Sequence, residues 1–309
     1  MKIFTLPAGE GWICDRFASE WNENNGEIST SDPFSADVVW LLADWCWDKM
    51  PRDLLQRKKV VCSVHHIVPE KFGDVQRQEF ADRDQFVDLY HVPCNMTYRQ
   101  ISSLTAKPIF VKPFWINGSI WNPIENKQDL KRKYGVRDEE FLIGSFQRDT
   151  EGSDLYSPKL EKGPDIFCDI VIEAHKSDPN ISVVLAGWRR QYVMRRLKDA
   201  KVPYRYTELP DFRTLNELYN LIDLYIVSSR YEGGPQAVLE CALTRTPIIS
   251  TPVGIAPEVL SMHDIIVPGA VGSLRRSTDV DFASNSVRDL VIPAGMQAFR
   301  QKVQELIDG

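Results

Sequence analysis

The sequence lacks the features that mark disulfide, zinc and membrane proteins. Its six cysteines form no C-x-x-C pair and several lie in apolar runs, so we expect them to be small buried residues. No apolar run is long enough to cross a bilayer, and the N-terminal segment MKIFTLPAGEGW has no long apolar core of the kind that a signal peptide needs. These absences predict a reduced, cytoplasmic location.

The chain also has no excess of positive charge, no internal repeat and no low-complexity tract. A net charge of −6 at pH 7 and a pI near 5.5 argue against a protein that holds nucleic acid mainly through its phosphates, although a local basic face is compatible with them. Five positive charges lie in RRQYVMRRLK, residues 189–198, which we interpret as a solvated helix face in preference to a site for an acidic acceptor.

Length and patterning predict two α/β domains. With 309 residues, 43% of them hydrophobic and 26% charged, the chain has an ordinary globular composition and enough length for two cores. Strand-like apolar segments alternate with helix-like segments throughout, which predicts parallel sheets joined by right-handed crossovers. The last clear strand-like segment is DIIVPGA, residues 264–270.

The most informative stretch is SSRYEGGPQAVLECALTRTPIISTPVG, residues 228–254. It contains a polar loop with Glu232, Gly233 and Gly234, an apolar helix-like run that begins at Pro235, and the strand-like TPIIST. Proline suits the first helical position because its missing N–H would be unpaired there anyway. The glycines allow the backbone to approach a ligand closely, and the start of a helix favours a phosphate.

Two carboxylates accompany this loop, since Glu232 lies in it and Glu240 follows eight positions later inside the helix-like run. An ionised carboxylate only accepts hydrogen bonds, so the pair suits hydroxyl groups. A ligand with a phosphate and several hydroxyls is, most simply, a sugar nucleotide. The alternative for the same residues is a helix cap followed by a core helix.

The E-x7-E pattern followed by T-P-V-G resembles the nucleotide-sugar site of retaining glycosyltransferases of the GT-B, glycogen-synthase-like type, closest to glycosyltransferase family 4. That resemblance implies two Rossmann-like domains facing each other across a cleft. It implies that Glu232 faces the donor sugar, that Glu240 binds the ribose, and that Gly233, Gly234 and Pro235 lie at the donor. It further implies an acceptor-side domain at residues 1–122, a nucleotide-sugar domain at 123–290, and a C-terminal helix within 291–309 that crosses back to the first domain.

In the resembling family, a strand is followed by an Arg and later by Lys-Gly, which together bind the donor diphosphate. Here Arg148 follows the strand-like FLIGSF, and Lys162 with Gly163 comes after the long loop DTEGSDLYSPKLE. A forked Arg and a point-charge Lys suit a diphosphate leaving group, because its charge grows as the glycosidic bond breaks. Lys159 in the long loop is an alternative to Lys162.

Two loops have further expected donor contacts. The segment PAGEGW, with Gly9 and Gly11, lies between a short strand and a helix, which is the arrangement that binds anions in nucleotide folds, although a tight turn needs glycines too. Trp12 belongs to the same loop. By resemblance, the loop from Glu208 to Asp211 passes near the nucleotide base, and we place Leu209 at the donor there.

In the first half, the apolar strand KKVVCSV ends at His65 and His66, and His65 matches the family position better. A histidine at such a strand end can orient a hydroxyl or donate to developing negative charge, although many lone histidines are only structural. Trp45 and Trp47 follow the strand ADVVWLLA. Their rings can stack on a sugar, and packing is the interpretation that we prefer.

The resemblance implies transfer of a sugar from a nucleotide diphosphate sugar to an acceptor hydroxyl, with retention. The expected acceptor is a saccharide or another hydroxyl compound, and nucleic acid is not an expected partner. We expect no cofactor and no essential metal, because neither D-x-D match, Asp82/Asp84 or Asp279/Asp281, ends an apolar strand.

Other classes of protein use similar ligands. A nucleotide-sugar epimerase or a phosphorylase on the same scaffold stays open, as does a non-catalytic sugar-nucleotide binding protein. An NAD-dependent oxidoreductase is disfavoured, because no G-x-G-x-x-G with a following acidic residue comes after a strand.

Overall fold

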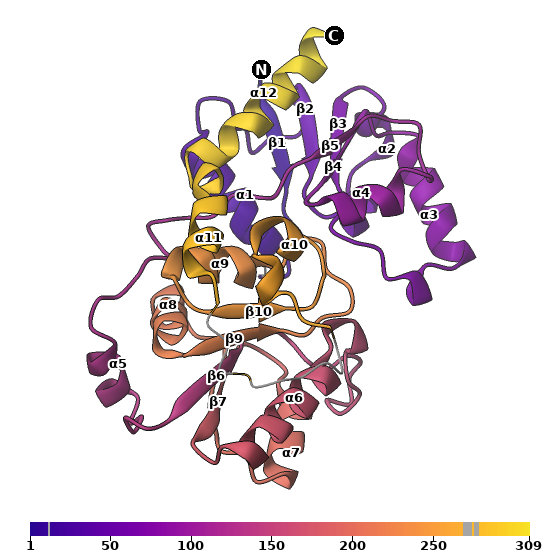
Figure 1. Ribbon diagram of the computed structural model, residues 1–309. Helices are drawn as coiled ribbons and strands as arrows, with labels where there is room; N and C mark the ends of the chain where they lie inside the picture. Colours follow the sequence, from indigo (N-terminus) through magenta and orange to yellow (C-terminus); the bar gives the residue numbers. More distant parts are fainter. Residues whose placement is uncertain (12, 268–273, 275–277) are drawn as a thin grey trace. The chain divides into compact units, whose positions relative to one another are not determined.

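The computed structural model describes residues 1–11, 13–267, 274 and 278–309 (Figure 1). The chain forms two compact units, of which unit 1 contains residues 1–115 and 292–309 and unit 2 contains residues 116–291. Each unit is built on a five-stranded sheet in which all neighbouring strands are parallel. The α/β fold with two parallel sheets, expected from the alternating elements, is confirmed. The structure divides the units between Trp115 and Ile116, whereas the sequence analysis placed a boundary near Asn122.

The sheet of unit 1 has the order β1-β2-β3-β4-β5. Its strands are β1 (Ile3–Leu6), β2 (Val38–Leu41), β3 (Lys59–Ser63), β4 (Leu89–Val92) and β5 (Ile109–Val111). Its helices are α1 (Ile13–Asn24), α2 (Arg52–Leu55), α3 (Asp74–Asp84), α4 (Asn95–Ile101) and α12 (Ala294–Asp308), with short 3-10 turns η1 (Asp44–Lys49) and η2 (Pro69–Lys71).

The chain of unit 1 reverses its direction across the sheet at β1. After α1, residues 28–30 run along the outer edge of β1, where the Ile3 amide donates to the Ile28 carbonyl at 2.7 Å and the Thr30 amide to the Ile3 carbonyl at 3.0 Å. The chain then continues to β2 on the other side of β1. Ligands bind at such switch points in open parallel sheets, so the loops after β1 and β2 are the expected place for a ligand in this unit.

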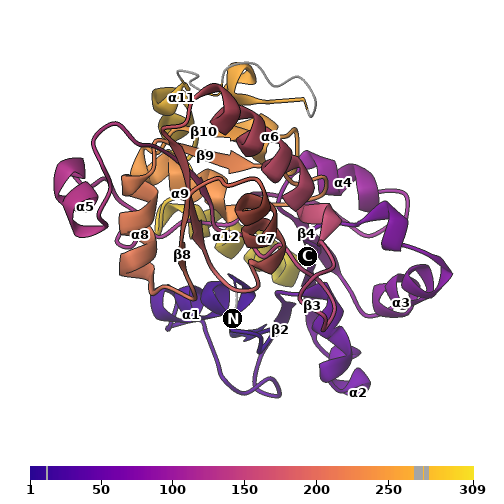
Figure 2. The same cartoon turned by 90° about the horizontal axis from the view of Figure 1, so that it is seen from below.

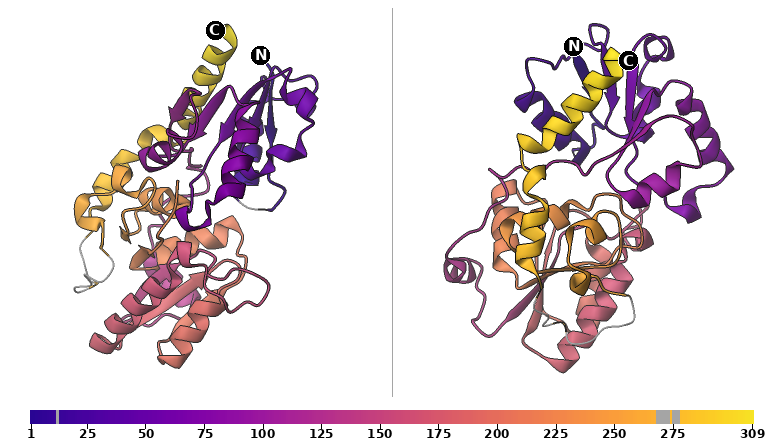
Figure 3. Two further views of the ribbon diagram at one scale, coloured as in Figure 1. Left: turned by 90° about the vertical axis from the view of Figure 1, so that its right-hand side faces the viewer. Right: turned by 45° about the horizontal axis from the view of Figure 1, so that its top comes forward.

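Helix α12 belongs to unit 1, and Figure 3 shows it running along the sheet of that unit. It buries Met296, Phe299 and Val303 in a core that also contains Trp40 and Trp115. The Phe299 ring centroid lies 5.4 Å from that of Trp40 and 5.3 Å from that of Trp115. The apolar spacing at the end of the chain therefore reflects a helix face that packs on the sheet.

His91 is a fully buried titratable group in this core, and its hydrogen bonds fix a neutral ring. Its Nε2 lies 2.8 Å from the Lys112 carbonyl oxygen, which only accepts, so Nε2 carries the proton. Its Nδ1 lies 2.9 Å from Ser63 Oγ, which itself accepts from Trp40 Nε1 at 2.9 Å. Because Ser63 Oγ accepts from Trp40, its own hydrogen is arranged to point toward His91 Nδ1. A second ring proton, on Nδ1, would therefore face the hydrogen of that hydroxyl. Burial lowers the pKa of His91 to about 3.

We expect this histidine to make folding pH-dependent. An unfolded histidine has a pKa of about 6.5, so below that pH the unfolded chain binds more protons than the folded chain. The free energy of unfolding should therefore fall as the pH drops from about 6.5 toward 3. Urea unfolding at pH 7 and pH 5 should show a larger loss for the wild type than for His91→Gln. An equal loss in both proteins would contradict the neutral buried ring.

The sheet of unit 2 has the order β10-β9-β6-β7-β8. Its strands are β6 (Phe141–Ser145), β7 (Ile181–Ala186), β8 (Tyr204–Thr207), β9 (Leu224–Val227) and β10 (Ile248–Ser250). Its helices are α5 (Lys127–Lys133), α6 (Pro164–Ser177), α7 (Gln191–Asp199), α8 (Phe212–Leu221), α9 (Gln236–Thr244), α10 (Ala256–Val259) and α11 (Val280–Ser286), with 3-10 turns η3 (Leu160–Lys162), η4 (Met262–Asp264) and η5 (Arg288–Leu290).

The chain of unit 2 winds outward from β6 in both directions. It runs from β6 through β7 to β8 on one side, with α6 and α7 packed side by side (Figure 2), and then returns to β9 and β10 on the other side of β6. The switch point therefore lies between β6 and β9. The loops that follow these two strands contain Arg148 and Glu232, which are separated in sequence by about half the length of the unit.

Three sequence-based expectations need comment. All six cysteines are buried and free of disulfides, as expected. Ile265 forms a single bridge with Ser250 rather than part of a longer strand, and residues 268–270 of the expected strand, like Trp12, lie outside the described residues. The interpretation of residues 189–198 as a solvated face is wrong for Arg189 and Arg190, which are both buried, Arg190 completely. No helix in the described ranges combines the length and apolar character that a membrane span requires.

Candidate functional site

The switch point of unit 2 brings together charged residues that are distant in sequence. Lys162 ends η3, and its Nζ lies 2.6 Å from Oε1 of Glu232, which stands in the loop after β9. Ser229 Oγ donates to the same carboxylate oxygen at 3.1 Å. The side chains of Lys162 and Glu232 are only 21% and 11% exposed, so water screens this pair less than it would screen a surface ion pair. An incoming anion can take the place of Glu232 beside Lys162, and sugar hydroxyls can then donate to the released carboxylate.

The backbone on both sides of this pair is tightly fixed. Gln147 Nε2 donates to the Lys162 carbonyl oxygen at 2.8 Å, and Ser228 Oγ donates to the Gly163 carbonyl oxygen at 2.8 Å. Gly163 has φ +59°, and a Cβ at this residue would lie 1.9 Å from the Ser228 carbonyl oxygen. Close packing of the two loop backbones therefore explains the glycine after Lys162, whether or not a ligand binds there.

The same reasoning gives a prediction for Gly163→Ala. A residue other than glycine at positive φ costs about 1 kcal/mol, and here the backbone contact adds a clash that has no flexible side chain to absorb it. Gly135→Ala is a matched control, because Gly135 has φ +62° and no atom of the described residues lies within 4 Å of its Cβ position. Urea unfolding should show a clearly larger loss for Gly163→Ala than for Gly135→Ala. Equal losses would mean that the loops move apart easily.

A second lysine, Lys159, lies near both Lys162 and Arg148. The long loop after β6 folds into a small hairpin, in which Thr150 bridges Pro158 and the Lys159 amide donates to the Asp149 carbonyl oxygen at 2.8 Å. Burial lowers the pKa of Lys159, and repulsion from Lys162 and Arg148 lowers it further. The three cations thus gather in one place, and this arrangement leaves both lysines as candidates for a diphosphate.

Arg148 has a defined position next to this hairpin. Its Nε donates to the Thr150 carbonyl oxygen at 2.7 Å, and its guanidinium carbon lies 5.4 Å from the ring centroid of Trp188, which follows β7. The indole holds the guanidinium at the carboxyl edge of the sheet by a cation–π contact. Trp188 was not singled out from the sequence, although its place directly after an apolar strand and a glycine is a usable signal.

Sequence reasoning also missed the buried pair Asp149–Arg190. Arg190 Nε donates to Asp149 Oδ2 at 3.1 Å, and the side chains are 1% and 2% exposed. The Arg190 guanidinium also donates to the Ser145 carbonyl oxygen at 2.5 Å and to the Ala186 carbonyl oxygen at 3.1 Å. It therefore joins the ends of β6 and β7 to the residue that directly follows Arg148. Burial raises the pKa of Asp149, and Arg190 opposes that shift.

Glu240 lies inside α9, the helix that follows the loop containing Glu232. It is buried, and Tyr219 OH donates to its Oε2 at 2.7 Å. Pro235 caps α9 in an extended conformation, φ −60° and ψ 106°, instead of being its first helical residue. Its carbonyl accepts the first helical hydrogen bond from the Val238 amide at 2.9 Å, which is the role of an N-cap residue.

The glycines of the E-G-G-P loop meet the T-P-V-G turn. Gly254 has φ +53°, and a Cβ there would lie 2.1 Å from the Gly233 carbonyl oxygen. Gly233 is buried by this approach, and Gly234 follows it directly before Pro235. The second glycine-containing motif thus sets the shape of the first, a connection that the sequence does not reveal.

In unit 1, the glycine loop after β1 binds an anion that belongs to the protein itself. The amides of Gly9, Glu10 and Gly11 donate to the Asp15 carboxylate at 2.8, 2.8 and 2.6 Å. Gly9 and Gly11 have φ +73° and +68°, which turns the three N–H groups toward one point. The expectation of an anion site describes the geometry, but a donor phosphate would have to displace Asp15 to use it.

His65 lies after β3 in unit 1, between aromatic rings. Its Nε2 lies 2.8 Å from the Leu42 carbonyl oxygen, so this nitrogen donates. The ring stacks on Phe114 at 5.5 Å and lies 5.7 Å from the exposed ring of Trp45. Trp47 is buried and packs against Phe86, as the packing interpretation expects, whereas the same interpretation is wrong for Trp45, which is 51% exposed.

Leu209 follows β8, and the D-x-D residues lie in or at the start of helices α3 and α11. Leu209 is exposed after β8 and has φ +44°. The aspartates have structural contacts: Asp82 with Gln78 and Asp84 with Thr105 in unit 1, Asp279 as the N-cap of α11, and Asp281 with Arg245. Within the described residues, no group of three or more His, Cys, Asp or Glu side chains is placed to hold a metal ion.

A known family matches about half of the chain. Residues 154–307 match the family Glycosyl transferases group 1. This glycosyltransferase match contains Lys159, Lys162, Glu232 and Glu240, and it begins after Arg148. The lipopolysaccharide core biosynthesis mannosyltransferase LpsB of Rhizobium meliloti is 22% identical over 148 residues, which cover 46% of this chain and 40% of that protein. The match therefore spans about two-fifths of that relative.

Solved structures resemble the whole chain. Anabaena Alr3699/HepE in complex with UDP and glucose has a TM-score of 0.79 at 13% identity and covers 99% of this chain and 100% of that one. The same protein in complex with UDP-glucose has a TM-score of 0.77 at 12% identity, covering 98% and 99%. Sucrose-phosphate synthase from Thermosynechococcus elongatus has a TM-score of 0.69 at 13% identity, covering 94% and 76%. These likenesses show the fold, which is that of GT-B glycosyltransferases.

Proposed function

We propose that the protein transfers a sugar from a nucleoside diphosphate sugar to an acceptor hydroxyl, with retention of anomeric configuration. The observation that carries the proposal is the pair of Lys162 and Glu232 at the switch point of unit 2, with Arg148 and Lys159 beside it. A group of cations next to a carboxylate matches the two ends of such a donor, a diphosphate and a polyhydroxyl ring. The glycosyltransferase match across residues 154–307 supports the same class.

Each residue has a proposed role in the transfer. As the bond between the sugar carbon and the diphosphate oxygen breaks, negative charge grows on that oxygen, and Arg148 and Lys162 stabilise it. Glu232 accepts hydrogen bonds from the donor sugar, and Glu240 accepts them from the ribose. The Gly233 and Gly234 backbone contacts the donor.

The donor and the acceptor are proposed with different support. UDP-sugars are the first choice of donor, because Alr3699/HepE is described in complex with UDP and UDP-glucose. Retention and the link to family 4 come from the resemblance of the E-x7-E block. His65 is proposed to orient the acceptor hydroxyl, and the acceptor is a saccharide or another hydroxyl compound. The proposal needs no metal or cofactor, since Arg and Lys balance the diphosphate, and free cysteines support a cytoplasmic location.

Thermal stability against a ligand panel tests donor binding. A ligand that binds only the folded state raises the melting temperature, so UDP, GDP, ADP, CDP, TDP and NAD can be compared directly. We expect a rise with one nucleoside diphosphate and its sugar derivatives, and a smaller rise in Lys162→Met. A rise with NAD alone, or with none of the diphosphates, would contradict the proposal.

A further inference from the structure

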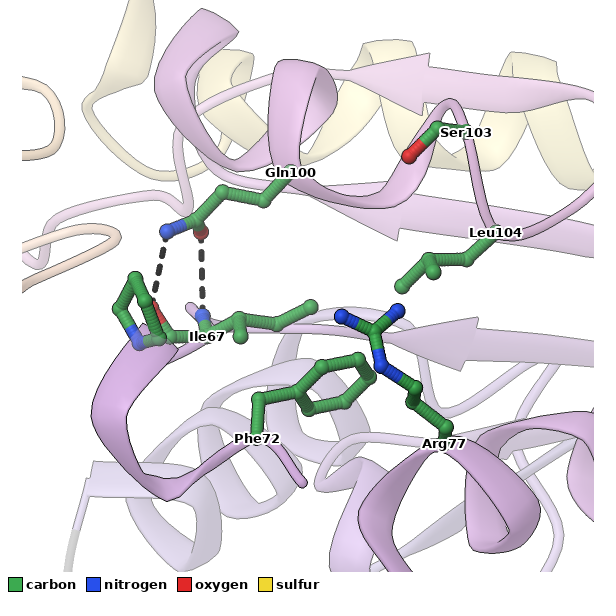
Figure 4. Close-up of a pocket in the computed structure, with 7 residues that line it drawn as sticks. Ile67, Phe72, Arg77, Gln100, Ser103 and Leu104 are labelled. Carbon is green, nitrogen blue, oxygen red and sulfur yellow. Dashed lines mark hydrogen bonds between the residues drawn. The ribbon is translucent and has the colours of Figure 1, made fainter. Parts of the chain in front are cut away.

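Unit 1 contains a recess near the proposed acceptor histidine. It has a volume of about 210 Å³, and Figure 4 shows it between the segment after β3, the start of α3 and the end of α4. Its walls are apolar at Ile67, Phe72 and Leu104 and polar at Arg77 and Ser103. This mixture of an apolar lining and a few polar groups is typical of small-molecule sites.

Arg77 brings a positive charge to the recess and is itself exposed to solvent. Figure 4 shows the Arg77 guanidinium between the side chains of Phe72 and Leu104, and its carbon lies 5.2 Å from the Phe72 ring centroid. Within the described part of the chain, Arg77 forms no ion pair with a carboxylate. The aromatic ring holds the guanidinium in place without using its hydrogen-bond donors.

The floor of the recess is rigid and is connected to His65. Gln100 clamps the backbone of Ile67, donating to its carbonyl oxygen at 2.8 Å and accepting from its amide at 3.0 Å. One turn earlier on α4, Thr97 Oγ1 donates to the His65 carbonyl oxygen at 2.9 Å. Two side chains of one helix thus fix both His65 and the residue that begins the recess. Ile67 is two residues from His65, a span of at most about 7 Å.

We propose that this recess binds an anionic group of the acceptor, a carboxylate or a phosphate carried on a sugar ring. This inference rests on the proposed function, because only a transferase has an acceptor. A guanidinium with free donors matches the two oxygens of a carboxylate or phosphate, and the apolar walls match the carbon face of a sugar. The volume is below the roughly 300–1,000 Å³ of drug-sized sites, so the recess takes one sugar residue. The neighbouring residue of the acceptor then presents its hydroxyl at His65.

Direct binding of small probes tests the recess without any donor. The probes are D-glucuronate, glucose 6-phosphate and neutral glucose, and ligand-observed NMR titration measures their affinity for the wild type. We expect at least one of the two anions to bind more tightly than glucose, and the pair to show whether carboxylate or phosphate is preferred. Arg77→Gln should weaken the binding of that anion about tenfold or more, because a charge-assisted hydrogen bond is lost.

Arg99→Gln is the matched control, since Arg99 lies on α4, is exposed and makes the same charge change outside the recess. It should leave anion binding unchanged. Anion binding that is equal in the wild type and Arg77→Gln, equal affinity for glucose, or no anion binding at all would overturn the inference. UDP binding is measured on the same variants. A protein that binds UDP but no anionic sugar contradicts only the recess, and one that binds the anion but no nucleotide contradicts only the proposed transfer.

Discussion

Lys162→Met is expected to lower the turnover of sugar transfer about 100- to 1,000-fold, the usual loss when one preorganised group that stabilises developing charge is removed. The variant keeps most of the length of the side chain and removes its charge. It also leaves Glu232 without the cation that lies 2.6 Å from it, so donor binding should weaken as well. Steady-state kinetics at saturating donor, with nucleotide release as the signal, measures the effect on turnover.

Two further variants make this test specific. Lys176→Met is the control, because Lys176 lies on α6 of the same unit, its side chain is exposed and it pairs with Glu173 on the surface. It should leave turnover unchanged. Lys159→Met distinguishes the two candidate lysines, and a larger loss in Lys159→Met than in Lys162→Met would transfer the diphosphate role to Lys159. Full turnover in both lysine variants would contradict the site.

Arg190→Met is expected to destabilise the protein by about 3–5 kcal/mol, the typical cost of leaving one partner of a buried ion pair alone. The change removes the cation beside Asp149 and the hydrogen bonds that Arg190 donates to the Ser145 and Ala186 carbonyls. The control is Arg196→Met on α7, the helix that begins directly after Arg190, where a 34% exposed side chain pairs with the exposed Asp169. A surface pair of this kind contributes about 0–1 kcal/mol. Urea unfolding of both variants measures the difference, and similar losses would contradict the importance of the buried pair.

The double variant Asp149→Leu/Arg190→Met adds a second comparison. Replacing a buried ion pair by apolar side chains often restores stability that a single replacement loses. Here the recovery should be partial, because Asp149 also accepts from the Tyr192 and Val193 amides at 3.2 and 3.4 Å. A double variant as unstable as Arg190→Met alone would mean that the backbone contacts, and not the charge on Asp149, decide the cost.

The sequence predicts those parts of the fold and site that depend on local pattern. Alternating apolar segments indicate both parallel sheets, because a strand covered on two faces must be apolar along its length. The distances in the E-G-G-P loop were not predictable in the same way. The contact of Gly254 with the Gly233 carbonyl joins two motifs through their backbones, and only the packing of the folded chain shows it.

Charged residues show where sequence reasoning fails. Arg190 lies in a basic segment that looks solvated, and its partner Asp149 is 41 residues away. Nothing in the spacing of the segment separates this arginine from Arg196, which is partly exposed. Asp15 is different, because an acidic residue that closely follows a glycine loop indicates a carboxylate that can accept hydrogen bonds from the amides of that loop. Its carboxylate occupies the amides that the glycines suggested for a phosphate.

The most direct test of the central claim is an NMR measurement of transfer itself. UDP-glucose, or the sugar derivative of whichever diphosphate raises the melting temperature, is incubated with the protein and a panel of neutral and anionic saccharides. We predict release of the nucleoside diphosphate together with a new anomeric signal of the same configuration as the donor, and neither signal with Lys162→Met. Release that requires inorganic phosphate, isomerisation of the donor without an acceptor, or donor binding with no reaction would contradict the account.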